Sequence, residues 1–598
     1  MVGFRRSVER LWAHREMAIA FALLFTFFRM ARLEGWDDGF YLSELTSAVG
    51  DRDLLLQDDL LRIENPLPLR LRALTVILDS GALQNTFSVG PPALHAAYAW
   101  PLLVGRAHPG LFPLRVLLAL GSMALLAMLV IVASRLAQRL GVPPALAPAP
   151  AVLAIVAGPL AIYGTRSYLG SHLLSAFWAA VLLAASLRWL EDGHLRQATA
   201  MGLAAGFLVI TRWQDAVLAA GLAPALVIAL RDPTARRRRL AGLALAALGG
   251  AAVASLQLLA WRAQFGSWTL MPQGPAYVSW TRPHLAFFLS TYHGLLPWAP
   301  GLVAGLVAFA WARPPLPRPT ALAYTVGVLA GAAAVVYVSA CVADWYGGDS
   351  YGPRRLSVLT PMVAVGLGHL MARLPRPARL AVAAAIVAWT VFTLTAFLSG
   401  YDDLRVALGG PPDPASPVST TAYEGARWLD APRSWPRVLR PGFTFSDRPR
   451  NLDRLLGAIA TLSVLLVVRA AAAAARTVRG QRMAVAALAA WVAVAVAWTL
   501  RLPSNARADA AWRDVVAGAD PGPRLGALPE SVRPAAWTIH AVHATARGNE
   551  PDARRALAHV DAVSAPGVDE AALAAWLRDP DARAFVADLA AGRRVVLP

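Results

Sequence analysis

The sequence predicts an all-α integral membrane protein with about 13 transmembrane helices, interface helices in the first outward loop and a small C-terminal helical domain. Two observations predict this class. Of the 598 residues, 57% are hydrophobic and only 16% are charged, and the mean hydropathy is +0.48. Apolar stretches also recur along most of the chain, separated by short polar loops. A soluble globular protein is therefore excluded.

Each predicted span is an apolar stretch long enough, or nearly long enough, to cross a bilayer. The stretches lie near residues 17–33, 112–134, 145–162, 168–187, 198–211, 215–230, 240–261, 285–311, 320–343, 356–372, 379–399, 455–475 and 483–500. The first stretch ends in arginines without a small-residue cleavage site, so we expect a retained span and not a signal peptide. Gly301 and Gly305 have the spacing of close helix packing.

The charges predict the orientation of the chain. The net charge is +19, and arginine supplies all of the positive charge because the sequence contains no lysine. Arginines gather in alternate short loops, on the side of the basic N-terminus, which the positive-inside rule makes cytoplasmic. Their position at span ends argues against nucleic-acid binding.

We predict a multi-span domain over 1–503, with its first outward loop at 34–111, and an outward-facing helical domain over 504–598. The single Cys341 excludes an intrachain disulfide.

Asp37 and Asp38 are adjacent carboxylates a few residues after the first apolar stretch. Carboxylates beside a bilayer are costly to desolvate and have no packing value. A loop that keeps them there is expected to use their charge, as a proton acceptor or as a cation ligand. The alternative is a solvated loop.

Residues 54–88 mix leucines with acidic residues as interface helices do, and Pro91-Pro92 opens an apolar stretch, 93–104, that is too short to span.

Three further outward segments carry polar and aromatic residues. They contribute Gln273, Tyr277 and His293; Asp344, Asp349, Arg354 and Arg355; and Arg212, Gln214 and Asp215. Rings beside amides and carboxylates suit sugar binding, because sugar faces are apolar and their hydroxyls need hydrogen-bond partners. Paired arginines suit a phosphate, which they grip through parallel hydrogen bonds. The alternative for the arginines is interface anchoring, and for His172 and His293 it is hydrogen bonding within the bundle.

At these residues the chain resembles bacterial members of the GT-C superfamily of membrane glycosyltransferases. The resemblance is carried by Asp37-Asp38, the interface segment, Val89-Gly-Pro-Pro92, Arg212-Trp-Gln-Asp215, His293-Gly-Leu-Leu-Pro-Trp298 and Gly347-Gly348 through Gly352-Pro-Arg-Arg355, and it covers residues 17 to about 373. It implies transfer of a sugar from a polyprenyl-phosphate-linked donor to a glycan, lipid or protein of the cell envelope, at the outer face of the cytoplasmic membrane. The base is then Asp37 or Asp38, with Asp37 favoured.

Two questions stay open at the level of sequence. Mg and Mn prefer oxygen ligands, and these would come from Asp344, Asp349 and Asp215 together with Asp37 or Asp38. No spacing in the sequence demands a metal. A transporter or lipid flippase is the main alternative function. Such proteins place ionisable residues inside spans and often have repeated halves, whereas here the span interiors are nearly free of charge. A non-catalytic scaffold for envelope assembly would leave the acidic pair unexplained.

Overall fold

The computed structural model describes residues 36–51, 56, 85–103, 111–167, 169–266, 268–269, 277–289, 293–345, 347 and 350–399, with Trp537, His540, Pro551 and Arg555. This part of the chain is all-helical and has no strand, only an isolated bridge between Val278 and Val342. The predicted fold class is confirmed there. Some predicted parts lie outside the described residues. They are the apolar stretches at 17–33, 455–475 and 483–500, nearly all of 54–88 and nearly all of the predicted C-terminal domain.

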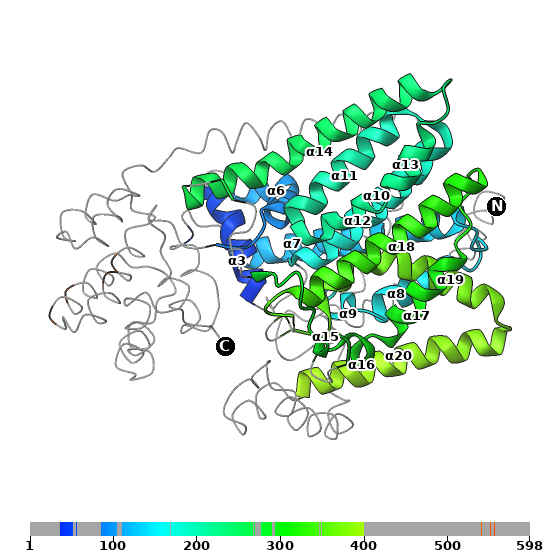
Figure 1. The fold of residues 1–598 in the computed structure, drawn as a ribbon. Helices are drawn as coiled ribbons and strands as arrows, with labels where there is room; N and C mark the ends of the chain where they lie inside the picture. Colours follow the sequence, from blue (N-terminus) through cyan, green and yellow to red (C-terminus); the bar gives the residue numbers. More distant parts are fainter. Residues whose placement is uncertain are drawn as a thin grey trace, which may run out of the picture. The chain divides into compact units, whose positions relative to one another are not determined.

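The described helices belong to two compact units. One unit contains α3 (Trp36–Thr46), the π-helical turn η1 (Ser47–Asp51), α6 (Gly90–Leu103) and the last turns of α14. We call it the acidic unit because Asp37 and Asp38 belong to it. The other, the arginine unit, contains the helices from α7 to α20 (Figure 1), apart from those turns and from the first turn of α7, which belongs to the acidic unit.

Six helical segments among the described residues are long and apolar enough to cross a membrane. They belong to α7 (Leu111–Arg139), α10 (Ser171–Asp192), α14 (Arg236–Phe265), α18 (Arg318–Cys341), η5 with α19 (Arg354–Leu359 and Thr360–Arg373) and α20 (Arg376–Ser399). All six fall on stretches that the sequence predicts as spans. Shorter apolar helical runs cover α11 (Leu195–Thr211), Trp213–Ala229 and Pro300–Trp311.

Three of the predicted spans are interrupted. Residues 145–162 form α8 (Pro148–Val156) and α9 (Leu160–Tyr163); residues 215–230 form the end of η2 (Trp213–Ala216), α12 (Val217–Ala220) and α13 (Ala223–Ala229); and residues 285–311 form α15 (Ala286–Leu289), α16 (Leu295–Trp298), α17 (Pro300–Ala308) and η4 (Phe309–Trp311). Pro159, Pro297 and Pro300 lie at or beside these breaks. Proline lacks the backbone N–H that a continuous helix requires, so hydropathy alone overestimates the length of these helices.

Close backbone contacts hold the arginine unit together. Helix α17 packs on α19, and a Cβ atom added to Gly366 would lie 1.8 Å from the carbonyl oxygen of Gly305. A Cβ added to Gly301 would lie 3.0 Å from the Cβ of Ala157. The prediction that Gly301 and Gly305 serve close helix packing is therefore confirmed. Without side chains at such crossings, neighbouring membrane helices gain extensive van der Waals contact.

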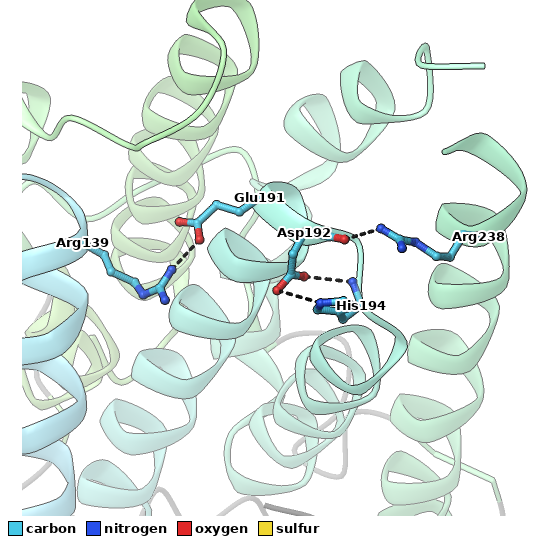
Figure 2. A network of polar contacts seen from close by, with 5 residues as sticks. All are labelled: Arg139, Glu191, Asp192, His194 and Arg238. Carbon is cyan, nitrogen blue, oxygen red and sulfur yellow. Dashed lines mark hydrogen bonds and ion pairs between the residues drawn. The ribbon is translucent and has the colours of Figure 1, made fainter. Parts of the chain in front are cut away.

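Polar contacts join the ends of three helices of this unit (Figure 2). Arg139 of α7 pairs with Glu191 of α10, and Arg238 of α14 donates to the carbonyl oxygen of Asp192. Asp192 also accepts a hydrogen bond from the backbone N–H of His194 at 2.9 Å. Gly193 ends α10 with φ +62, a left-handed conformation that favours glycine. This end of the bundle is therefore one of the arginine-rich loop regions that the sequence predicts.

Candidate functional site: an acidic helix and an arginine cluster

In the acidic unit, Asp37 and Asp38 lie in the first turn of helix α3. The segment predicted as the start of the first outward loop is therefore helical at these residues, and its outward orientation stays a prediction. The Asp38 side chain is buried and Asp37 is partly exposed. Unsatisfied backbone N–H groups give a helix N-terminus partial positive charge, and acidic side chains in the first turn are stabilised by it. The helix thus supplies an electrostatic reason for two carboxylates at this point.

A third carboxyl group of α3, Glu44, was missed by the sequence analysis. Its side chain is 4% exposed, and the amide of Asn85 donates a hydrogen bond to it at 3.4 Å. Burial raises the pKa of Glu44 to about 8, although the Asn85 amide acts in the opposite direction. Glu44 is therefore mostly protonated at neutral pH. The helical spacing of seven residues from Asp37, which puts the two on one face, was the available signal.

Helix α6 completes the described part of this unit. It begins at Gly90-Pro91-Pro92 and packs on α3, so the short apolar stretch predicted there is a helix. The backbone N–H of Val89 donates to the side chain of Gln257 at 2.9 Å, which ties the start of α6 to the last turns of α14. His95 is buried in α6, and its Nδ1 lies 2.5 Å from the hydroxyl of Tyr98.

In the arginine unit, Arg355 organises a cluster of predicted site residues. Its buried guanidinium donates to the carbonyl oxygen of Asp344 at 2.7 Å, to that of Trp345 at 3.4 Å, to the Asp344 carboxylate at 2.7 Å and to the Tyr277 hydroxyl at 3.0 Å. Asp344 and Tyr277 come from separate connections between helices. Arg355 therefore fixes both connections against the start of η5.

Electrostatics keep Asp344 ionised in this cluster. Burial by itself would raise the pKa of Asp344, but the charge of Arg355 and hydrogen bonds from Tyr277 and Arg355 outweigh it and hold the pKa below its ordinary value. Burial raises the pKa of the Tyr277 phenol, so it stays protonated at neutral pH. The Asp344 side chain is still 39% exposed. A charged and partly accessible carboxylate thus stands at the edge of the cluster.

Arg212 and Asp215 form a second part of the cluster, together with His172. Arg212 Nη1 lies 2.6 Å from His172 Nδ1, and Arg212 Nε lies 3.6 Å from an Asp215 carboxylate oxygen. A guanidinium has no acceptor, so Nδ1 of His172 carries no proton. His172 is also hydrogen-bonded to the backbone of Arg354. His172 and Asp215 both interact electrostatically with Arg355, so the two parts are neighbours.

Arg354 lies beside a glycine that the fold requires. Gly347 has φ +73, and a Cβ atom there would lie 3.1 Å from Arg354 Nε and 2.8 Å from the Ser350 hydroxyl. A larger residue would be strained and would displace the Arg354 side chain. The Arg354 side chain is partly exposed, unlike that of Arg355. The two neighbouring arginines therefore have different surroundings.

The remaining predicted site residues fall into three groups. His293 is buried with its ring against Trp298, at 5.6 Å between centroids. Gln214 is partly exposed in η2, next to Asp215. Gln273 and Asp349 lie outside the described residues. No group of three or more His, Cys, Asp or Glu side chains among the described residues is placed to hold a metal ion, and the divalent-cation site stays a prediction.

Aromatic residues join His172 to the segment before η5. The Tyr163 and His172 rings are 4.4 Å apart between centroids, and the Tyr163 hydroxyl accepts a hydrogen bond from the backbone N–H of Tyr351 at 2.8 Å. The Tyr351 hydroxyl lies 2.7 Å from that of Thr393 in α20. The sequence analysis missed Tyr163 and Thr393, and it included Tyr351 only as part of the segment from Gly347 to Arg355. No local motif marks Tyr163 and Thr393, because these contacts join helices far apart in the chain.

No family model and no curated protein matches the chain. Similar solved structures include ArnT from Cupriavidus metallidurans in the apo state, at 18% identity and a TM-score of 0.43 over 78% of this chain and 79% of that one. ArnT bound to undecaprenyl phosphate matches at 16% identity and a TM-score of 0.41 over 86% and 81%. The archaeal oligosaccharyltransferase AglB from Archaeoglobus fulgidus, in complex with an inhibitory peptide and a dolichol-phosphate, matches at 12% identity and a TM-score of 0.36 over 80% and 60%. These similarities concern the fold alone, and their TM-scores are low.

Proposed function

We propose that this protein is a membrane glycosyltransferase that takes a sugar from a polyprenyl-phosphate-linked donor. The observation that carries the proposal is the cluster around Arg355, at one end of several apolar helices. It combines Arg212, Arg354 and Arg355 with Asp215 and Asp344. An excess of guanidinium groups next to a bilayer suits a lipid-linked phosphate, which Arg binds through charge-assisted hydrogen bonds.

The proposed reaction needs a base and an anion site. The acceptor hydroxyl oxygen attacks the anomeric carbon, the bond from that carbon to the phosphate oxygen breaks, and the polyprenyl phosphate leaves with the bonding electrons. Asp37 or Asp38 takes the hydroxyl proton, with Asp37 favoured because its side chain is partly exposed whereas Asp38 is buried. The leaving group is a stable anion, so a cation stabilises it and no general acid is required.

The two neighbouring arginines receive different roles. Arg355 donates to Asp344, Trp345 and Tyr277, and we assign it as a positioning residue for that loop. Arg354, partly exposed beside Gly347, is the proposed phosphate ligand. Tyr277 and Asp344, with His293, Gln273, Gln214 and Asp349, are proposed to contact the sugar or its acceptor.

The experiment is sugar transfer by the purified full-length protein in proteoliposomes, with polyprenyl-phosphate sugars as donors. Asp37→Asn and Asp38→Asn keep shape and hydrogen bonding but remove the base, so at least one variant should lose transfer by about 100-fold or more. Asp232→Asn, in an exposed loop, is the matched control. Normal turnover by both Asn variants would overturn the assignment of the base.

Envelope glycans and lipids of a deletion strain, compared by mass spectrometry, identify the acceptor. A missing sugar on a glycan, lipid or protein names the acceptor class directly. Accumulation of an unmodified lipid on one side of the membrane, with all transferred sugars intact, would instead support the transporter or flippase alternative and contradict a transferase.

A further inference from the structure

An exposed apolar stripe runs along helix α18 of the arginine unit. The exposed residues are spaced three or four apart, which places them on one face of the helix. They are Leu322, Val326, Ala330, Ala333 and Tyr337. In a helix long and apolar enough to span a membrane, such a face is expected to contact lipid chains. Tyr337 marks the end of the stripe and is 44% exposed, as expected of an aromatic residue at a bilayer surface.

The stripe continues beyond α18 onto residues 277–289. The Tyr337 hydroxyl donates to the carbonyl oxygen of Trp280 at 2.6 Å, so the two residues are adjacent. Trp280 is 50% exposed, Leu285 is 70% exposed and Leu289 is 57% exposed. Leu285 and Leu289 are four residues apart at α15, while Phe287 between them is buried. The segment thus has an inner side against the bundle and an apolar outer side.

Backbone contacts hold this segment on the end of α18. Val278 forms a bridge with Val342, the N–H of Ser279 donates to the carbonyl oxygen of Cys341 at 2.8 Å, and the N–H of His284 donates to that of Ala340 at 2.8 Å. At its start, the carbonyl oxygen of Tyr277 accepts from the N–H of Ala343 at 2.8 Å. The position of the outer side is therefore fixed relative to α18.

We propose that residues 277–289 lie in the membrane interface with Trp280, Leu285 and Leu289 inserted among phospholipid chains. The occupant is the bilayer, because the exposed apolar surface is continuous with the lipid-facing stripe of α18. Large exposed apolar surfaces are otherwise rare on soluble faces. Arg282 and Thr281, exposed between Trp280 and Leu285, suit the headgroup layer. This inference is independent of sugar transfer, and it assigns Trp280 to lipid contact instead of the sugar contact that the sequence suggests for this loop.

Insertion of residues 277–289 in the interface would also fix the depth of the arginine cluster. Tyr277 is the first described residue of the segment, and its hydroxyl accepts a hydrogen bond from Arg355. If the following residues lie in the interface, Arg355 and Asp344 lie at about the level of the lipid headgroups. The anchor would then hold the cluster at a fixed depth from the bilayer surface.

Spin labels test the proposal on the full-length protein in vesicles of phosphatidylethanolamine and phosphatidylglycerol. Cys341 is replaced by Ser, and single cysteines are placed by Leu285→Cys and Leu289→Cys. Val326→Cys is the lipid control on the α18 stripe, and Thr234→Cys, in an exposed polar loop, is the water control. Collision rates with oxygen, which concentrates in lipid, are compared with those of a water-soluble nickel complex.

For the labels at positions 285 and 289, the ratio of the oxygen collision rate to the nickel collision rate should be close to that of the lipid control at position 326. Their nickel collision rates should be several-fold lower than that of the water control at position 234. Two exposed positions are used so that the result does not depend on one variant folding. If the labels at positions 285 and 289 were as accessible to nickel as the label at position 234, the proposal would be overturned. The surface would then face water, as a docking surface for a soluble protein does.

Discussion

Two carboxyl groups, Asp344 in the arginine unit and the more deeply buried Glu44 in the acidic unit, have opposite protonation. Asp344 in the arginine unit accepts from the Arg355 guanidinium at 2.7 Å, and its pKa is held below the ordinary value. Glu44 in the acidic unit has an amide partner, Asn85, at 3.4 Å, and burial raises its pKa to about 8. One group is a carboxylate at neutral pH and the other is mostly a neutral acid.

The hydrogen-bond partner and the degree of burial together decide the charge of each carboxyl group. A guanidinium stabilises the ionised form by its charge and by several donors. An amide contributes one neutral hydrogen bond, which does not offset the desolvation of a carboxylate. The arginine unit therefore holds a charged carboxylate at Asp344, and the described part of the acidic unit holds a proton at Glu44.

Removal of Arg355 is expected to have the largest effect. Arg355→Met leaves Asp344 ionised and partly buried without its guanidinium, which costs about 3 kcal/mol, at the low end for a broken buried pair because Asp344 is partly exposed. Denaturant unfolding in detergent micelles measures the loss. Arg318→Met, at the exposed start of α18, is the control. An equal stability of the two variants would contradict the role of Arg355 in fixing the Asp344 and Tyr277 connections.

The second prediction concerns the pH dependence that Glu44 produces. Its folded-state pKa of about 8 exceeds the ordinary value of 4.5, so the folded state keeps a proton that the unfolded state releases. The associated stability is fully present below pH 4.5 and is lost as the pH rises through 8, by roughly 3 kcal/mol between pH 5.5 and 8. Melting temperatures of the wild type and Glu44→Gln measure it.

Glu44→Gln should lose less stability over this range than the wild type, because glutamine does not titrate. Glu191→Gln, which changes a partly exposed glutamate, should keep the wild-type dependence. Parallel curves for the wild type and Glu44→Gln would show that Glu44 is ionised in the folded protein and would remove the contrast with Asp344.

The third prediction separates Arg354 from its neighbour. Under the proposed function, Arg354→Lys keeps the charge but loses the two-pronged geometry, so it should weaken donor use by about 1 to 3 kcal/mol. The stability of the variant should change little, in contrast to Arg355→Met. Initial rates at varied polyprenyl-phosphate sugar measure the effect, with Arg318→Lys as the control. Unchanged donor dependence would return Arg354 to an anchoring role.

The smallest expected effect is that of Asn85→Ala. The Asn85 amide favours the ionised form of Glu44, so its removal should raise the pKa of Glu44 further, by the equivalent of about 0.5 to 1 kcal/mol for one hydrogen bond. The pH at which the melting temperature stops falling should therefore move upward, while Thr86→Ala, one residue away, should leave it unchanged. A downward movement would mean that Asn85 stabilises the neutral acid.

The sequence predicted the membrane helices where apolar residues are continuous. The stretches at 168–187 and 320–343 are found as α10 and α18, because hydropathy and length suffice to identify a span. It did not predict the breaks within 145–162 and 285–311, where Pro159, Pro297 and Pro300 lie at or beside the interruptions of the helix. Those interruptions depend on where freed backbone groups find new partners among neighbouring helices.

The sequence named residues for the candidate site but not their contacts. Local composition pointed to Arg212, Asp215, Asp344 and Arg355 as polar residues of outward segments, because aromatic rings beside carboxylates suit a sugar and paired arginines suit a phosphate. Which carboxylate pairs with which arginine could not be predicted, since Tyr277 is 78 residues from Arg355 and His172 is 40 residues from Arg212.

By itself, the sequence determined that the chain is helical, that it is built for a membrane, and where its polar residues interrupt the apolar ones, because these properties depend on local hydropathy. Only the tertiary structure decided that Arg355 is occupied by protein acceptors, that Glu44 is protonated and that Trp280 faces outward. Charge state and exposure depend on which groups the packing of distant helices brings within a few ångströms. A linear pattern of residues does not contain that information.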